Sequence, residues 1–108
     1  IETHEEEARS MLERISKAQL AYSLQNGGKY TDLVSLVSAG LLPEDVKTSD
    51  STGYTYIVQL SSQNMRYAAA ATPAAYGKTG RLSFLLRQDE KGLSRVSSRD
   101  NGGKPLIP

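Results

Sequence analysis

The first quarter of the chain repeats apolar positions with the period of an α-helix. Apolar residues and one glutamine recur at spacings of three and four, which places them on a single helix face. These residues are Ala8, Met11, Leu12, Ile15, Ala18, Gln19 and Tyr22. The pattern predicts one amphipathic helix over about residues 3–25, and Asn26-Gly27-Gly28 predicts its end, because glycine readily adopts the left-handed conformation of a helix terminus. A helix of this length is ~35 Å long, so we expect its acidic first turns to project beyond the core.

Residues 26–52 have the composition of a connecting segment that contains one short helix. Thr31 is a candidate N-cap for a helix over residues 32–39. Gly40 predicts the end of that helix, and Pro43 prevents its continuation, because proline lacks the backbone N–H that a helix interior needs.

Segments with a period of two follow, which is the pattern of strands with one buried face. They cover residues 54–60, 65–72 and 81–87, and a shorter fourth segment covers residues 93–96. The run Ala68 to Ala71 is equally compatible with a helix on propensity alone, but the preceding turn and the following Pro73 favour a strand. In the third strand we expect Ser83 to point away from the apolar face.

This order of elements predicts an α+β fold. Strands with one apolar face must bury it, and the long helix is the element available to cover it. We therefore expect a long N-terminal amphipathic helix packed on a three- to four-stranded antiparallel sheet, with the helix at 3–25, a connecting loop at 26–52 and the sheet at 53–96, in a single domain over residues 1–96. Residues 97–108 are rich in serine, glycine and proline, and we expect a loosely ordered C-terminal tail there.

The charge is unevenly distributed along a chain whose formal net charge is only +1. Residues 1–7 carry four carboxylates and no lysine or arginine, whereas residues 66–104 carry eight basic residues against three acids. Such asymmetry is compatible with an acidic partner or nucleic acid, although a solvated surface is the more ordinary interpretation. The chain has no cysteine, so disulfides and thiolate metal sites are excluded.

The stretch "TPAAYGKT" over residues 72–79 differs from a phosphate-binding P-loop only at its first glycine, which is Thr72 here. A P-loop is followed by a helix, whereas the residues after Gly80 alternate like a strand. We therefore interpret the stretch as a connection between two antiparallel strands, with Gly77 and Gly80 providing positive φ angles.

Candidate chemistry is sparse. His4 is the only histidine and lies in an acidic helix turn, where a solvated side chain is the expected role. With one histidine and no cysteine, neither a zinc site nor a serine triad is expected, and we do not expect an enzyme. Asp100 and Asn101 could donate oxygens to calcium, but the EF-hand spacing is absent and a polar turn is favoured.

The order of residues from 8 to 42 resembles the helix and following loop of type IV pilins and pseudopilins. The shared positions are Ala8, Leu12, Ile15, Ala18-Gln19, Tyr22, Gly27-Gly28-x-Tyr30, Leu33, Leu36 and Gly40-Leu41-Leu42. The stretches "GYTYIVQL", "YAAAATPAAYGKTGRLSFLL" and "GLSR" are similar to the strands and turns of the same family, so the resemblance covers residues 8–95.

This resemblance implies a structural subunit of a type IV pilus or related bacterial filament, assembled with identical or related subunits. It implies that an apolar N-terminal helix, absent from this chain, holds the subunit in the inner membrane with its domain in the periplasm before assembly into an extracellular filament. Many pilins close a C-terminal loop with a disulfide; here packing or a bound ion would have to replace it. The alternatives within the family are a pseudopilin of a type II secretion system and a DNA-binding competence-type pilin.

Two groups of charged residues are candidates for contacts with partners. Acids and one arginine near the helix start are candidates for subunit contacts, and we expect them to pair with basic residues of a neighbouring subunit. These residues are Glu5, Glu6, Glu7 and Arg9. Basic residues of the C-terminal half are candidates for contact with a polyanion such as nucleic acid. They are Lys78, Arg81, Arg87 and Arg95.

Overall fold

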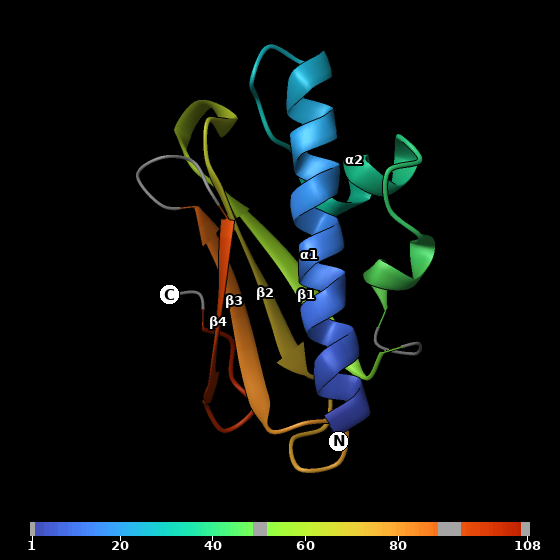
Figure 1. Ribbon diagram of the computed structural model, residues 1–108, viewed down its shortest axis with the longest axis vertical. Coiled ribbons are helices and arrows are strands. Elements are labelled where there is room, and N and C mark those ends of the chain that lie inside the picture. Colours follow the sequence, from blue (N-terminus) through green and yellow to red (C-terminus); the bar gives the residue numbers. More distant parts are fainter. Residues whose placement is uncertain (1, 49–51, 89–93, 107–108) are drawn as a thin grey trace.

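In the computed structural model, one long helix lies across one face of a four-stranded sheet (Figure 1). The structure describes residues 2–48, 52–88 and 94–106. The helical elements are α1 (Glu2–Gln25), α2 (Leu33–Ser38) and the short 3-10 helices η1 (Glu44–Lys47) and η2 (Ser62–Asn64). The strands are β1 (Tyr54–Leu60), β2 (Tyr67–Pro73), β3 (Leu82–Gln88) and β4 (Ser94–Asp100). The α+β prediction is confirmed: one layer is the long helix and the other is an antiparallel sheet.

The sheet is a meander in which each strand pairs with the next one along the chain, in the order β1-β2-β3-β4. Its register places Tyr56 opposite Ala71 and Leu86 opposite Val96, so the inward positions of neighbouring strands match. Side chains alternate between the two faces of a strand, and α1 with its neighbours covers the inner face. The strand predicted over 65–72 is present as β2 over Tyr67–Pro73, and its alanine run does not form a helix.

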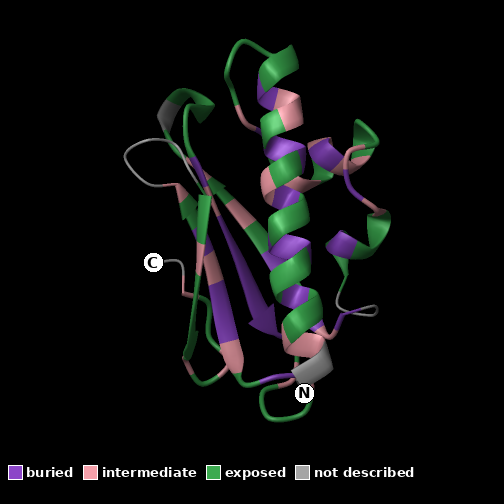
Figure 2. Cartoon of the chain, in the orientation of Figure 1, coloured by how far each residue is buried: buried purple, intermediate pink, exposed green. Residues whose placement is uncertain are grey.

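Helix α1 runs along almost the whole molecule. Its 24 residues span ~36 Å, and the longest dimension of the chain is 41 Å. Its predicted inward face is confirmed, since these side chains are buried except for a half-buried Tyr22 (Figure 2). The helix ends at the predicted place, where the Gly28 N–H donates to the Ser23 carbonyl at 2.8 Å and Gly27 has a φ of 68°.

The prediction that the acidic first turns project beyond the core is wrong. Ala8 and Leu12 are completely buried, because the first half of α1 packs on the sheet beside the β2–β3 connection. The opposite end of α1 reaches past the strands instead (Figure 1). Two large apolar side chains are exposed in these last turns, Leu20 at 58% and Leu24 at 78%.

The inner face of the sheet supplies most of the large core side chains. Tyr54, Tyr56, Tyr67, Phe84 and Leu86 are buried there. The alanines of β2 that face α1 are fully buried, which lets the helix pass over the middle of the sheet. Met65, the first residue of the predicted strand 65–72, lies outside β2 and is 51% exposed.

The short helix α2 confirms the predicted turn of helix in the connecting segment, but its cap differs. The N-cap is Asp32, whose Oδ1 accepts the Ser35 N–H at 2.9 Å. This backbone hydrogen bond lowers the pKa of Asp32, because it stabilises the charged carboxylate. Thr31, the predicted cap, is bonded to α1 instead, and Gly40 ends the segment with a φ of 76°.

The C-terminal part is more ordered than its composition indicated. Strand β4 continues to Asp100, so residues 97–100, predicted as the start of a loose tail, form strand. Ser83 does lie on the outer face of β3, as predicted, but it is completely buried. Its hydroxyl donates to the Lys104 carbonyl at 3.0 Å, so the tail folds back over the outer face of the sheet.

Candidate functional site

The stretch that resembles a P-loop connects two antiparallel strands, β2 and β3, as predicted. Gly77 has the positive φ that was expected there, at 82°. The prediction for Gly80 is wrong, because this residue is needed for space and not for its φ angle. A Cβ at Gly80 would lie 2.7 Å from Cζ of Tyr54, whose hydroxyl donates to the Leu82 carbonyl at 2.7 Å. Burial, and after it the Glu5 carboxylate, raises the pKa of Tyr54, so the hydroxyl stays a donor.

The start of α1 is tied to the start of β3 by Glu5. Its Oε2 accepts the N–H of Arg81 at 3.0 Å and of Leu82 at 2.9 Å. Arg9, one turn further on, places its guanidinium 5.5 Å from the centre of the Phe84 ring, in the range of a cation–π contact. Two of the four predicted subunit-contact residues are therefore engaged within their own chain. Glu6 and Glu7 are exposed and stay candidates.

The engagement of Glu5 leads to a stability prediction. Replacing Glu5 by alanine removes a charged acceptor shared by two backbone N–H groups, and we expect a loss of about 1 kcal/mol, because solvent can replace the bonds at this partly exposed place. Thermal or urea unfolding measures the loss, with Glu6→Ala as the matched control that is expected to change little. Equal stability of the two variants would show that the Glu5 contact is not formed in solution.

His4 is not the solvated helix residue that its acidic surroundings indicated. It is half-buried beside Gly53, where an added Cβ would lie 3.5 Å from its Cγ. Its Nδ1 is buried and has no hydrogen-bond partner within the described part of the chain. In the same part, no group of three or more His, Asp, Glu or Cys side chains is placed to hold a metal ion.

Asp100 and Asn101, the weak candidates for calcium in a segment where a polar turn was favoured, close the C-terminal tail. The Tyr76 hydroxyl lies 2.8 Å from both carboxylate oxygens of Asp100, and this hydrogen bond lowers the pKa of Asp100. The Asn101 amide donates to the carbonyls of Lys104 and Pro105, each at 3.1 Å. Together with the bond from Ser83 to the Lys104 carbonyl, these bonds hold the tail onto the sheet.

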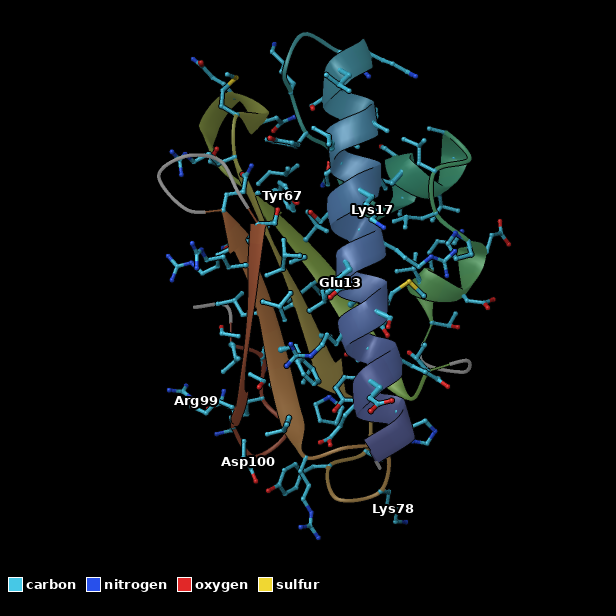
Figure 3. All side chains as sticks on the ribbon, in the orientation of Figure 1. Glu13, Lys17, Tyr67, Lys78, Arg99 and Asp100 are labelled. Atoms are coloured by element: carbon cyan, nitrogen blue, oxygen red, sulfur yellow. The ribbon has the colours of Figure 1, made fainter. Side chains whose placement is uncertain are left out.

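A mixed polar and apolar stripe follows the side of α1 that faces away from the sheet. Glu6, Glu13, Lys17, Leu20 and Leu24 are exposed and recur at spacings of seven, four, three and four, which aligns them on one face. Figure 3 shows Glu13 and Lys17 directed away from the sheet. We call these five residues the outward stripe. Its two leucines were missed at the sequence level, although leucines outside the inward pattern of an amphipathic helix are the available signal.

The predicted polyanion-contact residues form two groups and not one. Lys78 lies in the β2–β3 connection near the start of α1 (Figure 3). The exposed Arg81 directly precedes β3. Arg87 and Arg95 face each other in register across β3 and β4, near the other end of these strands. Arg99 and Lys104, which the prediction did not include, are also exposed. Arg99 lies opposite Ser83 on the outer face of the sheet, and the Lys104 carbonyl accepts the Ser83 hydroxyl.

The fold separates the charges into two layers. Residues 2–48, which form the helical layer, carry eight acids and five basic residues. The described residues of the sheet and tail, 52–88 and 94–106, carry seven basic residues and one acid, Asp100. Seven basic residues and one acid give these described ranges a formal charge of +6, against −3 for residues 2–48 with their five basic residues and eight acids.

Comparisons with protein-family models, with curated proteins and with solved structures found no match. The resemblance to pilins therefore stays a prediction from the residues. Within the described ranges, no helix combines the length and the apolar character needed to cross a membrane.

Proposed function

We propose that this chain is a non-enzymatic structural subunit of a type IV pilus or a related filament, and that it assembles through α1. The observation that carries the proposal is the outward stripe, which ends in Leu20 and Leu24 on a helix whose opposite face is fixed to its own sheet. A subunit that stacks with copies of itself through a helix needs this division between an inner and an outer face.

The energetics favour burial of the exposed leucines by another subunit. Full burial of a leucine is worth about 1.5–3 kcal/mol, so two leucines per subunit contribute substantially at every contact of a polymer. Contacts between different faces of identical subunits extend into open helical assemblies when the rotation does not close a ring. A rod-like helix of ~36 Å is suited to such stacking.

The other parts of the proposal follow from the resemblance. An apolar helix ahead of residue 1 would hold the subunit in the bacterial inner membrane, with this domain in the periplasm, until it joins an extracellular filament. The tail closed by Asp100, Asn101 and Ser83 takes the place of the disulfide loop of many pilins.

The test changes the outward stripe without unfolding the domain. We expect Leu20→Lys combined with Leu24→Lys to abolish filaments in cells that produce the complete gene product and its assembly machinery, because two charged lysine side chains cannot replace the apolar contact. Lysine is chosen because a cation near a helix C-terminus is favourable for the helix itself. Electron microscopy of sheared surface fractions gives the filament count, and thermal unfolding of the 108-residue chain checks the fold.

The matched control is Ile57→Lys combined with Met65→Lys, which changes two apolar side chains of comparable exposure, 45% and 51%, away from α1. Filaments are expected to persist in this control. Normal filaments from the Leu20 and Leu24 variant, with a folded subunit, would refute assembly through this face.

A further inference from the structure

Strand β4 forms an open edge of the sheet (Figure 1). In the part of the chain that the structure describes, β4 pairs with β3 alone, and six of its seven residues are exposed. The opposite edge strand, β1, is contacted by η1 of the connecting segment. An open edge presents a row of backbone N–H and C=O groups without a neighbouring strand, and such a row is a template for one more strand.

Most of the usual protections against strand addition are missing from β4. Its register with β3 is continuous over all seven residues, so no bulge interrupts the edge. Its sequence, SRVSSRD, contains neither proline nor lysine, and its serines are too small to shield the backbone. The remaining protection is charge, and charge excludes some partners while it favours others.

Backbone alternation identifies which groups of β4 are open. Along a strand, the N–H and C=O groups of successive residues point to opposite neighbours. The Tyr67 N–H points to β3, since it donates to the side chain of Gln88 at 3.1 Å. Carried through the register of β2, β3 and β4, this alternation directs the backbone of Ser97 to β3 and that of Val96 and Ser98 to the open edge.

A second copy of the chain, pairing through its own β4, is the main competing occupant of this edge. The antiparallel register that pairs all seven residues is symmetric about Ser97, and it places Arg95 of each copy beside Arg99 of the other. Like charges at directly opposite positions are destabilising. The sequence of β4 therefore disfavours full pairing with itself.

An acidic segment meets no such repulsion. The described residues of the sheet and tail carry a formal charge of +6. Arg99 lies on the outer face of β4, where its guanidinium makes a long 3.4 Å bond to Asn101 and keeps other N–H donors for a carboxylate. On the inner face, Val96 is half-buried, so an apolar neighbour would complete its cover.

We propose that the open edge of β4 binds an extended acidic segment of another protein, which adds to the sheet antiparallel to β4 as a fifth strand. In this mode of recognition, main-chain hydrogen bonds supply the affinity and alternate side chains supply the specificity. The segment has acidic residues on its outer side, beside Arg99 and Ser97, and apolar residues on its inner side, beside Val96 and Ser98. Strand addition uses the sheet edge and filament assembly uses the outward stripe of α1, so the two proposals succeed or fail separately.

The experiment measures binding of a fluorescein-labelled heptapeptide to the 108-residue chain by fluorescence anisotropy. The peptide has threonine at both ends, glutamate at its second, fourth and sixth positions and valine at its third and fifth. We expect saturable binding. The matched control is the same peptide with N-methyl groups on both valines, which keeps the charge and the side chains but removes the N–H groups that face β4. We expect it to bind about tenfold or more weakly.

Variants of the chain test the same bonds from the other side. Ser98→Pro removes an N–H that points to the open edge and not to β3, so the fold is expected to persist in thermal unfolding while peptide affinity falls by about tenfold. Ser98→Ala keeps this N–H and is expected to bind like the unchanged chain. Arg99→Gln is expected to weaken binding by about two- to fivefold and to reduce its salt dependence, whereas Arg14→Gln on α1 is expected to do neither.

Three results would overturn the proposal. The first is absence of binding at millimolar peptide. The second is equal affinity of the methylated and unmethylated peptides, which indicates attraction by charge alone; this comparison decides the matter even if Ser98→Pro fails to fold. The third is self-association of the chain in sedimentation that Ser98→Pro abolishes, which assigns the edge to a second copy.

Discussion

Replacement of Gln19 by glutamate is expected to lower the free energy of unfolding by about 2–4 kcal/mol at neutral pH. Gln19 is completely buried in α1 and is paired at both ends with one residue of the connecting segment. Its Nε2 donates to the Thr31 carbonyl at 2.6 Å, and its Oε1 accepts the Thr31 N–H at 3.0 Å. A carboxylate can accept the N–H but cannot donate to the carbonyl, so it places a buried charge against an oxygen with no proton between them.

The loss is expected to depend on pH with a defined sign. The protonated glutamic acid can donate to the Thr31 carbonyl again, so the folded state holds the proton more tightly and its pKa rises above the unfolded value of about 4.3. The variant is therefore closest to the unchanged chain below pH ~4, and its deficit grows as the pH rises from there through the folded-state pKa. Urea unfolding at pH 4 and pH 7, relative to the unchanged chain at each pH, measures the difference.

Gln59→Glu on the exposed side of β1 is the matched control, since it makes the same chemical change at the surface. It is expected to alter stability by less than about 0.5 kcal/mol. If the two glutamate variants lose equal stability, or if the Gln19 variant loses more at pH 4 than at pH 7, the paired bond to Thr31 does not have the role assigned here.

Gly80→Ala is the second large effect, with an expected loss of about 2–4 kcal/mol. The added methyl group would overlap the buried ring of Tyr54, whose hydroxyl is held by the Leu82 carbonyl on β3. Tyr54 is completely buried in the core, so the ring cannot move away without disturbing Phe84, with which it makes a tilted ring contact at 5.9 Å. Thermal unfolding measures the loss.

Two further variants separate this clash from a backbone effect. Gly77→Ala in the same connection meets no atoms but has a positive φ, and it is expected to cost only about 1 kcal/mol. In a Tyr54→Phe background the ring lacks the hydroxyl that the methyl group meets first, so Gly80→Ala is expected to cost less there than in the unchanged chain. Equal costs in both backgrounds would place the origin of the effect elsewhere.

Local patterns accounted for the secondary structure well, and they were weakest where an interaction joins distant segments. The period of α1 identified its buried face, including Gln19, but not the reason for a buried amide. That reason is Thr31, which was itself predicted as a helix cap. The composition of the tail predicted a loose segment. That prediction missed the bond from Ser83 to the Lys104 carbonyl, because it joins residues that no local pattern relates.

For the candidate surfaces, too, local patterns predicted part of the result and contacts between distant segments decided the rest. Charge counts along the chain indicated a basic C-terminal half, and the register of β3 and β4 decided that Arg87 and Arg95 share one face with Arg99 while Lys78 lies apart. The three acids and one arginine at the helix start were equivalent candidates for subunit contacts at the level of sequence. In the folded chain, Glu5 and Arg9 make contacts within the subunit.

The sequence by itself determined the long helix and its buried face, the existence and order of the strands, and the ends at Gly28 and Gly40. These properties depend on backbone propensity and on hydrophobic periods of 3.6 and 2, which act between residues close in the chain. The tertiary structure alone decided which end of α1 is exposed, why Gly80 must lack a side chain, how the tail is closed and which charges share a surface. Those outcomes depend on contacts between residues far apart in the chain, whose energies exist only after the helix and the sheet have packed together.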